Sequence, residues 1–339
     1  MVTIADVAAY AGVGAGTVSR VLNDSPQVSE ATRARVLEAI DELQYQPSTL
    51  ARALSRGRSH TLGVVVPFFT HASAVERLRG VVAELDGSRY DVVLFNVESP
   101  VHRDEHFRNL TRRDRADGLL VLSLPPPERE LHRLLDAGVP VVLVDAECKG
   151  VPSITTDDVE GGRIAARHLV ELGHTRIGFI GDDPNNRFGF TASAKREHGY
   201  RSVLADAGLR VRRGYIRYGS HDRTVARRLA AKLLAQRDRP TAVFASSDVQ
   251  ALGVIGAARD AGMTVPGDVS VVGFDDIEIS GYAGLTTVRQ PLYESGRLGA
   301  RVLLEALEGG GSPMPVRHEL PLELIVRSTT SPPRKDANG

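Results

Sequence analysis

The sequence has little cysteine and no tryptophan: Cys148 is the single cysteine among its 339 residues. One cysteine excludes an intramolecular disulfide framework and a cysteine-rich metal site. No apolar run approaches the roughly 18 residues that a membrane-spanning helix requires. The amino-terminal segment carries Asp6 where a signal peptide would have a cationic end followed by an apolar core. These absences predict a protein of the cytoplasm.

An excess of charge of either sign is also lacking, because 42 Lys and Arg side chains balance 42 Asp and Glu side chains. The first sixty residues are balanced too, so net charge gives no support to nucleic-acid binding. The distribution says more than the total. Arg52, Arg56 and Arg58 fall together in a stretch without acidic residues, which predicts a local basic patch. The length suits two or three globular domains.

Residues 3–45 have the pattern of three short helices. Thr3 is a candidate N-cap with Asp6 three positions on, and the apolar residues that follow keep helical spacing. A second helix is expected to start near Gly14, and Ser29 is placed to cap a third.

From Thr61 on, apolar strand candidates alternate with helical stretches. The strands are hydrophobic throughout rather than at every second position, which is typical of parallel sheets buried on both faces. We therefore expect doubly wound α/β subdomains, with ligands at the carboxyl ends of the strands. The strand candidates are residues 61–67, 91–97, 118–124, 139–145, 176–182, 241–247 and 269–276, and the helical stretches are 72–87, 158–172, 222–236 and 247–261.

The glycine-rich segment GVGAGTVSRVLN, residues 12–23, allows three interpretations. A dinucleotide fingerprint, G-x-G-x-x-G, fits poorly because Thr17 replaces the last glycine and the preceding residues look helical. A small structural helix pair is the second interpretation. The third is a helix-turn-helix in which Ala11, Gly12 and Val13 form the turn. Its second helix would present an outward face almost without bulk, which suits close approach to the major groove.

Four motifs in this region, DVAAYAGV, TVSRVLN, VSEATRARV and YQPSTLARAL, closely resemble the headpiece of the lactose-repressor/galactose-repressor family of bacterial transcription regulators. The resemblance continues through LVELGHTRIGFIG, ALGVIGAARDAGMTVPGDVSVVGFDD, LTTVRQP and ELIVRST. It implies a three-helix headpiece and a periplasmic-binding-protein-like core of two doubly wound parallel-sheet subdomains. The implied function is a repressor whose affinity for operator DNA changes when a small molecule binds between the subdomains. Gly14 departs from the serine that usually caps the family's recognition helix.

By matching position, the resemblance implies contacts to double-stranded, pseudo-palindromic operator DNA. Leu54 would enter the minor groove between the central base pairs. The eight-residue hinge helix STLARALS would fold only on DNA, because so short a helix is marginal in water. A plain linker is the alternative for this segment. The expected DNA contacts are Thr3, Ala15, Gly16, Thr17, Ser19, Arg20, Asn23, Ala51, Arg52 and Leu54.

The resemblance also divides the chain and predicts a homodimer. The chain should cross between the core subdomains near Thr155, Thr287 and Val316. The tail after Arg327 contains prolines and no apolar heptads, so it cannot form a tetramerising coiled coil. The expected parts are a headpiece at 1–46, a hinge helix and linker at 47–59, a core at 60–330 and a flexible tail at 331–339, with the N-subdomain at about 60–155 and 288–315 and the C-subdomain at about 156–287 and 316–328.

For the effector, Arg196 stands three residues before Gly199, as the family's ligand-binding arginine does. Asp145 and Asp275 end predicted strands, where an α/β sheet holds its ligand. One fork of donors facing carboxylates suits a neutral, hydroxyl-rich molecule such as a sugar. A purine or nucleoside effector is the alternative, and Arg196 with Asp275 could instead be an internal ion pair. The expected effector contacts are Phe68, Phe69, Asp145, Phe188, Arg196, Ser247 and Asp275.

One further motif points to a different class of protein. HRDEH, residues 102–106, matches the inverted zinc-protease pattern H-x-x-E-H, but no third ligand is evident. No G-x-S-x-G elbow and no phosphate loop occur in the sequence. A ligand-binding or hydrolytic α/β protein without DNA binding is therefore the alternative function. We expect no enzymatic activity, no cofactor and no metal.

Overall fold

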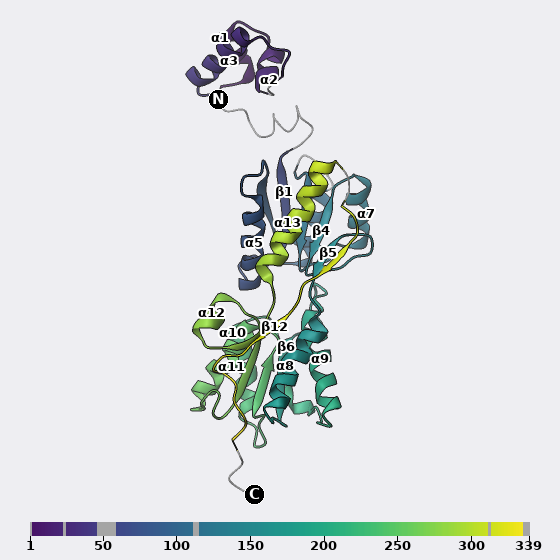
Figure 1. Ribbon diagram of the computed structural model, residues 1–339, viewed down its shortest axis with the longest axis vertical. Helices are drawn as coiled ribbons and strands as arrows, with labels where there is room; N and C mark the ends of the chain where they lie inside the picture. The colour runs from purple at the N-terminus through teal and green to yellow at the C-terminus, as the bar shows by residue number, and fades with distance from the viewer. Residues whose placement is uncertain (1, 23–24, 46–58, 111–114, 311–312, 335–339) are drawn as a thin grey trace. The chain divides into compact units, whose positions relative to one another are not determined.

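The computed structural model describes residues 2–22, 25–45, 59–110, 115–310 and 313–334. Its internal contacts form two units, Met1–Thr61 with Arg113–Asp117, and Leu62–Arg112 with Gly118–Gly339. The first unit contains three amino-terminal helices and the second contains two six-stranded sheets (Figure 1). Within these ranges, no helix is both long and apolar enough to span a bilayer.

The helices of the first unit are α1 (Ile4–Ala11), α2 (Ala15–Leu22) and α3 (Glu30–Glu42). Thr3 and Asp6 form the predicted capping box, in which the Asp6 carboxylate accepts a hydrogen bond from the Thr3 backbone N–H at 2.7 Å. Gly12 ends α1 at φ 65°, a left-handed conformation that other residues rarely adopt. Ser29 caps α3, as predicted.

A small apolar core holds these three helices together. Val7 on α1, Val18 on α2 and Val36 on α3 are fully buried. Val18 and Val21 anchor α2, Leu22 packs beside them, and Ala15, Gly16 and Arg20 remain exposed. The helix starts one residue after Gly14, whose carbonyl accepts a hydrogen bond from the Thr17 N–H.

The first sheet of the second unit has the strand order β11-β5-β4-β3-β1-β2. Helices α5 (Ala72–Leu85) and α13 (Leu292–Gly309) lie side by side on it (Figure 1). Helices α6 (Pro100–Leu110) and α7 (Glu128–Asp136) pack against each other. The strands are β1 (Thr61–Pro67), β2 (Asp91–Val97), β3 (Gly118–Leu122), β4 (Val141–Val144), β5 (Ser153–Thr155) and β11 (Arg317–Glu319).

The second sheet repeats this plan in the order β12-β10-β9-β8-β6-β7. In both sheets the earliest strand lies between the second and the third, which creates a topological switch point beside it. The strands are β6 (Ile177–Asp182), β7 (Ile216–Gly219), β8 (Ala242–Ala245), β9 (Ser270–Asp275), β10 (Thr286–Arg289) and β12 (Glu323–Ile325), and the helices are α8 (Asp158–Glu171), α9 (Ala192–Asp206), η1 (Arg213–Tyr215), α10 (Arg223–Leu234), α11 (Asp248–Asp260) and α12 (Glu278–Tyr282).

Two features of the sheets differ from the sequence-based expectation. Strand β12 pairs with β10 in the antiparallel sense, so the second sheet is not wholly parallel. Strand β2 was expected to be buried on both faces, but Val93 and Leu94 are 41% and 44% exposed. The reason is that β2 is an edge strand, which nothing within the described chain covers on that side.

The chain crosses between the two sheets after Thr155, between β10 and α13, and between β11 and β12. The expected crossings near Thr287 and Val316 lie a few residues too early. Strand β10 continues to Arg289 in the second sheet, and β11 still belongs to the first. Strands of three or four residues are placed by their hydrogen-bonded neighbours rather than by hydrophobicity, so the apolar pattern did not show where they end.

Two glycines bring α5 and α13 into backbone contact. A Cβ on Gly80 would overlap the carbonyl oxygen of Tyr293, and a Cβ on Gly296 would overlap that of Arg77. The two helices therefore approach more closely than any side chain would permit. This contact also fixes the position of Arg77, whose side chain reaches the cavity described below.

Helices α8 and α9 repeat the arrangement in the second sheet's half of the unit. A Cβ on Gly199 would overlap the carbonyl oxygen of Val159, and a Cβ on Gly162 would overlap that of Arg196. The two glycine contacts thus hold the helices that carry the two buried arginines of the cavity, Arg77 and Arg196.

We predict that Gly296→Ala lowers the free energy of unfolding by about 1–3 kcal/mol, because the added methyl group must push α13 away from α5. Gly309→Ala on the same helix is the matched control, since no atom of the described residues lies within 4 Å of the position that its added methyl group would take. That control should be neutral or slightly stabilising. Urea unfolding of both variants measures the difference, and equal midpoints would contradict the close contact.

Candidate functional site

A cavity of about 400 Å³ lies between the carboxyl ends of the two sheets. The loops that follow β1, β3 and β4 contribute Phe68, Ser123 and Asp145. From the other sheet, β6 and β9 end in Asp182 and Asp275, which line the same space. These residues lie close together because the strands that precede them are parallel. The carboxyl ends of parallel strands lie at the same edge of their sheet.

The backbone is strained where it lines this cavity. Phe68, Ser123 and Asp145 have φ values of 46°, 53° and 59°, and Asp275 has 119°. Positive φ is uncommon for residues other than glycine and costs of order 1–3 kcal/mol each. Strain of this kind is concentrated at ligand-binding positions, so the backbone itself marks the cavity as functional.

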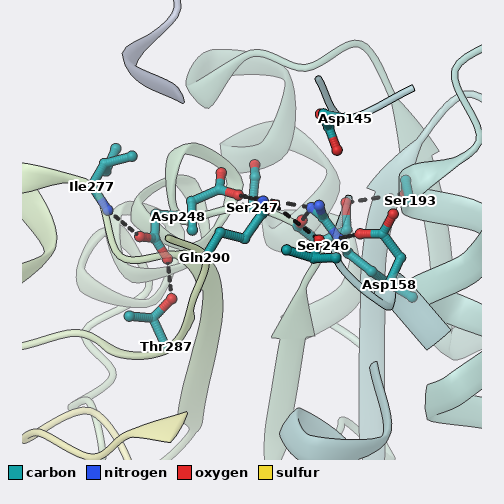
Figure 2. A network of polar contacts seen from close by, with 12 residues as sticks. Asp145, Asp158, Ser193, Ser246, Ser247, Asp248, Ile277, Thr287 and Gln290 are labelled. Carbon is teal, nitrogen blue, oxygen red and sulfur yellow. Dashed lines mark hydrogen bonds and ion pairs between the residues drawn. The ribbon is translucent and has the colours of Figure 1, made fainter. Parts of the chain in front are cut away.

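Arg196 on α9 is the buried cation at the centre of the site. Its Nε donates to Asp158 Oδ1 at 2.8 Å, and its Nη1 donates to the carbonyl oxygen of Ser246 at 2.7 Å. Its guanidinium carbon lies 3.7 Å from the centre of the Phe274 ring. Figure 2 shows Asp158 and Ser246, the two acceptors of these hydrogen bonds. Asp275 is farther away, with its Oδ1 3.9 Å from Nη1.

The charge of Arg196 is maintained by its neighbours. Burial works against the charged form, but attraction by Asp158, then Asp275 and Asp145, outweighs it and raises the pKa of Arg196. The structure therefore pairs Arg196 mainly with Asp158 rather than with Asp275, and the side chain still lines the cavity.

Gln290, in the crossing between β10 and α13, joins the two halves of the site. Its Nε2 donates to Asp275 Oδ1 at 2.6 Å. Its Oε1 accepts from Thr156 Oγ1 at 3.4 Å and from Arg77 Nη2 at 3.5 Å. Arg77 in turn lies 3.1 Å from Asp145 Oδ2. A ligand that contacts either carboxylate therefore acts on groups that belong to both subdomains.

Asp248 forms a second buried network beside Gln290 (Figure 2). Its carboxylate accepts hydrogen bonds from the Ile277 N–H, the Ser280 hydroxyl and the Thr287 hydroxyl. Burial, followed by the nearby charge of Asp275, raises the pKa of Asp248 to about 7. These contacts tie α11 to α12 and β10, so Asp248 supports the site without lining it.

The charges that line the cavity are nearly balanced. Burial works against a charged imidazole at His221, but its hydrogen bond to Asp182 and the attraction of Asp182 and Asp275 raise the pKa of His221. Asp182 and Asp275 thus favour the charged form of this side chain. The lining carboxylates are Asp145, Glu147, Asp158, Asp182 and Asp275, and the other cations are Arg77, Lys195, Arg196 and Arg317.

Aromatic rings flank the same space. The Phe68 ring makes an edge contact with Phe188 at 5.3 Å, and Phe188 stacks on Phe190 at 5.2 Å between ring centres. Phe68 and Phe190 line the cavity, whereas Phe188 lies behind them and does not.

The expected effector residues fall into two groups. Phe68, Asp145, Arg196 and Asp275 line the cavity. The others are held elsewhere by local contacts. The Phe69 side chain lies outside the lining and the residue is 40% exposed, Phe188 is covered by its neighbours, and Ser247 is fully buried because its hydroxyl caps α11.

Sequence reasoning missed several residues of the lining. Asp182 ends a predicted strand, so the rule that selected Asp145 and Asp275 would have found it. His71 and Arg77 lie at the start of α5 and within it, where their residue types are ordinary for a surface helix. Gln290 becomes significant only because the chain crosses between sheets at that residue.

The amino-terminal unit presents the other candidate site on α2. Ala15, Gly16 and Arg20 are exposed, and Thr17 and Ser19 are half-buried. Within the part of the chain that the structure describes, no atom lies within 4 Å of a Cβ built on Gly16, so this face is open there. Thr3 is exposed before α1, with its hydroxyl bound to Asp6. Four expected DNA contacts lie outside the described residues: Asn23, Ala51, Arg52 and Leu54.

The HRDEH motif lies on α6 and does not form a metal site. His106 Nε2 contacts the Asn96 carbonyl oxygen at 3.1 Å. Across the described ranges, no group of three or more His, Cys, Asp or Glu side chains is arranged to hold a metal ion. Cys148 is a free, partly buried thiol in the loop after β4.

Two family models match the chain. The model for bacterial regulatory proteins of the lacI family matches residues 3–48, and a periplasmic binding protein-like domain matches residues 166–330. Catabolite control protein A of Priestia megaterium is 34% identical over 309 residues, which covers 89% of this chain and 91% of that protein. The transcriptional repressor PurR of Vibrio campbellii is 34% identical, covering 97% and 98%.

Solved structures agree with these matches. A complex of the transcriptional regulator CelR with cellobiose has a TM-score of 0.70 and 34% identity, covering 97% of this chain and all of that one. The lac repressor dimer bound to operator and the anti-inducer ONPF has a TM-score of 0.81 and 28% identity, covering 97% and 99%. These proteins are transcription regulators and not enzymes. The chain therefore belongs to the lacI family of bacterial regulatory proteins and is a DNA-binding transcriptional repressor with a ligand-binding core.

Proposed function

We propose that a neutral, hydroxyl-rich molecule, specifically a sugar, binds in the cavity and changes the affinity of this repressor for its operator. The observation that carries the proposal is the pairing of Arg196. Its Nε already donates to Asp158, and its Nη1 already donates to the Ser246 carbonyl oxygen. An anionic ligand would have to compete with these partners.

The remaining polar groups favour hydroxyl donors. Asp145, Asp182 and Asp275 offer carboxylate oxygens to the cavity, and such oxygens only accept hydrogen bonds. An anion placed among them would be repelled, whereas sugar hydroxyls would donate to them. Phe68 and Phe190 offer apolar ring faces for the C–H side of a sugar. The cellobiose complex of CelR supports the same class of ligand.

A purine is the second candidate effector. The relatives named PurR favour it, and the stacked rings of Phe188 and Phe190 offer a flat surface to a planar base. The two candidates differ in how many hydrogen bonds they can donate to the carboxylates, because a purine has fewer donor groups than a sugar.

For DNA, we infer that α2 enters the major groove through its open face at Ala15, Gly16 and Arg20, with Thr17 and Ser19 beside them. The proposed hinge, residues 47–59, would follow the minor groove with Leu54 at its centre. Ser59 and His60, at the end of that segment, donate three hydrogen bonds to the Asp117 carboxylate. Because bacterial operators lie in the cytoplasm, we place the protein there.

We further propose that the working form is a homodimer. The exposed apolar residues Val93 and Leu94 on β2 and Tyr282 on α12, which is 83% exposed, leave apolar surface that a second copy would cover. A symmetric dimer would also present two copies of α2 to a pseudo-palindromic operator.

A thermal-shift screen tests the class of effector. At a hundred times its dissociation constant, the cognate ligand should raise the free energy of unfolding by about 2.7 kcal/mol. We expect stabilisation by a neutral sugar from a panel that includes cellobiose and ribose, and none by hypoxanthine or guanine. Stabilisation by the purine bases alone would replace the sugar with the second candidate.

Asp145→Asn tests the carboxylate contact to the effector. Loss of a charge-assisted acceptor should weaken binding of the stabilising sugar by about 1.5–3 kcal/mol, measured by calorimetry. Asp86→Asn, at the exposed end of α5, is the control and should bind as the parent does. Unchanged affinity in Asp145→Asn would mean that the carboxylate serves only its partners Arg77 and Ser123.

Gly16→Glu tests the DNA-binding face. The headpiece has room for the glutamate side chain. In the proposed complex, however, its bulk and negative charge would lie against the DNA. Affinity for a duplex selected from a random library should therefore fall at least about tenfold. Ala34→Glu, on the exposed side of α3, is the control for charge. Equal losses in both variants, or a selected duplex without dyad symmetry, would count against the proposed docking.

A further inference from the structure

Two histidines face each other across the cavity from opposite subdomains. His71 precedes α5 beside the first sheet, and His221 lies between β7 and α10 beside the second. Their ring centres are 5.3 Å apart with planes at 25°. Phe68 stacks on His71 at 5.1 Å and 18°. The three rings therefore form a column that crosses from one subdomain to the other.

Only one end of this column has a carboxylate partner among the described residues. His221 Nδ1 lies 3.4 Å from Asp182 Oδ1, which also accepts a hydrogen bond from Gln250. Asp275 and Arg196 act on His221 from farther away. In the described chain, the His71 ring has no carboxylate at ion-pair distance, and the charges that shift its pKa are those of His221 and Asp182.

The two rings titrate in opposite directions. Burial, and then repulsion by His221, lower the pKa of His71. Asp182 raises the pKa of His221 against the effect of burial. Between these two pKa values the pair carries one positive charge, and a neutral imidazole then stacks on an imidazolium.

We propose that His71 and His221 form a clasp that joins the two subdomains over the cavity while the pair holds one proton and releases them when it holds two. Two imidazolium rings at this separation repel each other, and His71 has no carboxylate of its own in the described chain to offset that repulsion. Arg196 also opposes a proton on His221, whereas Asp182 partly favours one on His71.

The sign of the pH dependence follows from the shift at His71. A histidine whose pKa is lower in the closed form favours that form when neutral. The contribution of His71 to closure is therefore complete above its ordinary pKa and is lost as the pH falls towards the lowered value. The consequence for the effector rests on the proposed function: a ligand enclosed by both subdomains should bind more weakly in acid. One proton can change that affinity by at most about tenfold per pH unit.

Histidine titration by NMR tests the clasp without any effector. In the full-length protein with labelled histidine, His221→Phe should move the pKa of His71 up towards its ordinary value, because the repulsive charge is gone. His132, which is exposed on α7, should not respond and serves as the internal control. An unchanged His71 titration in His221→Phe would show that the rings do not meet in solution and would overturn the clasp.

Hydrogen exchange tests the opening itself. His71→Phe keeps a ring in the column but cannot be protonated, and His71→Gln is the second variant should the first perturb folding. At pH 5.5 the parent should exchange several-fold faster than either variant at residues 186–193, which border the cavity, and all three should agree at pH 7.5. Equal exchange at pH 5.5 would refute acid-driven opening. Neither experiment needs a sugar, so failure of the effector screen and failure of the clasp are separate outcomes.

Discussion

The enclosure of Arg196 is the constraint on which the rest of the ligand site depends. A guanidinium removed from water must be neutralised and hydrogen-bonded where it stands, and Asp158 with the Ser246 carbonyl does both. The side chain can reach them only because Gly162 and Gly199 let α8 and α9 touch. With its charge already balanced, the arginine becomes part of the wall of the cavity rather than an anchor for an anion.

The two halves of the core each bury one arginine, and both do so with the same arrangement of strands and helices. Each has a five-strand parallel run with one switch point, each brings carboxylates to the ends of its strands, and each holds one buried arginine on a helix fixed by a glycine contact. Gln290 connects the halves because it touches both Arg77 and Asp275. One network of polar contacts therefore joins the cavity lining of the two halves.

The sequence was sufficient wherever the cause of a structure is local. Thr3 with Asp6, Gly12 and Ser29 determine helix ends within a few residues of themselves, and continuous apolar runs revealed the central strands. Asp145 and Asp275 could be selected because a strand's end is visible in the sequence. His71, Arg77 and Gln290 could not, because their partners come from elements far away in the chain. The short strands β10, β11 and β12 depend on their neighbours for the same reason, and the crossings beside them were misplaced accordingly.

The left-handed backbone at Phe68, Ser123 and Asp145 limits how this site can be changed by evolution or by design. β-Branched residues are strongly disfavoured at positive φ, whereas asparagine, aspartate and glycine are tolerated. Few residue types therefore fit at these three positions of the cavity lining, whichever ligand is to be bound. Phe190, Thr191 and His221 line the cavity without this restriction. A repressor of altered specificity would therefore be sought by varying these three residues while Phe68, Ser123 and Asp145 are kept.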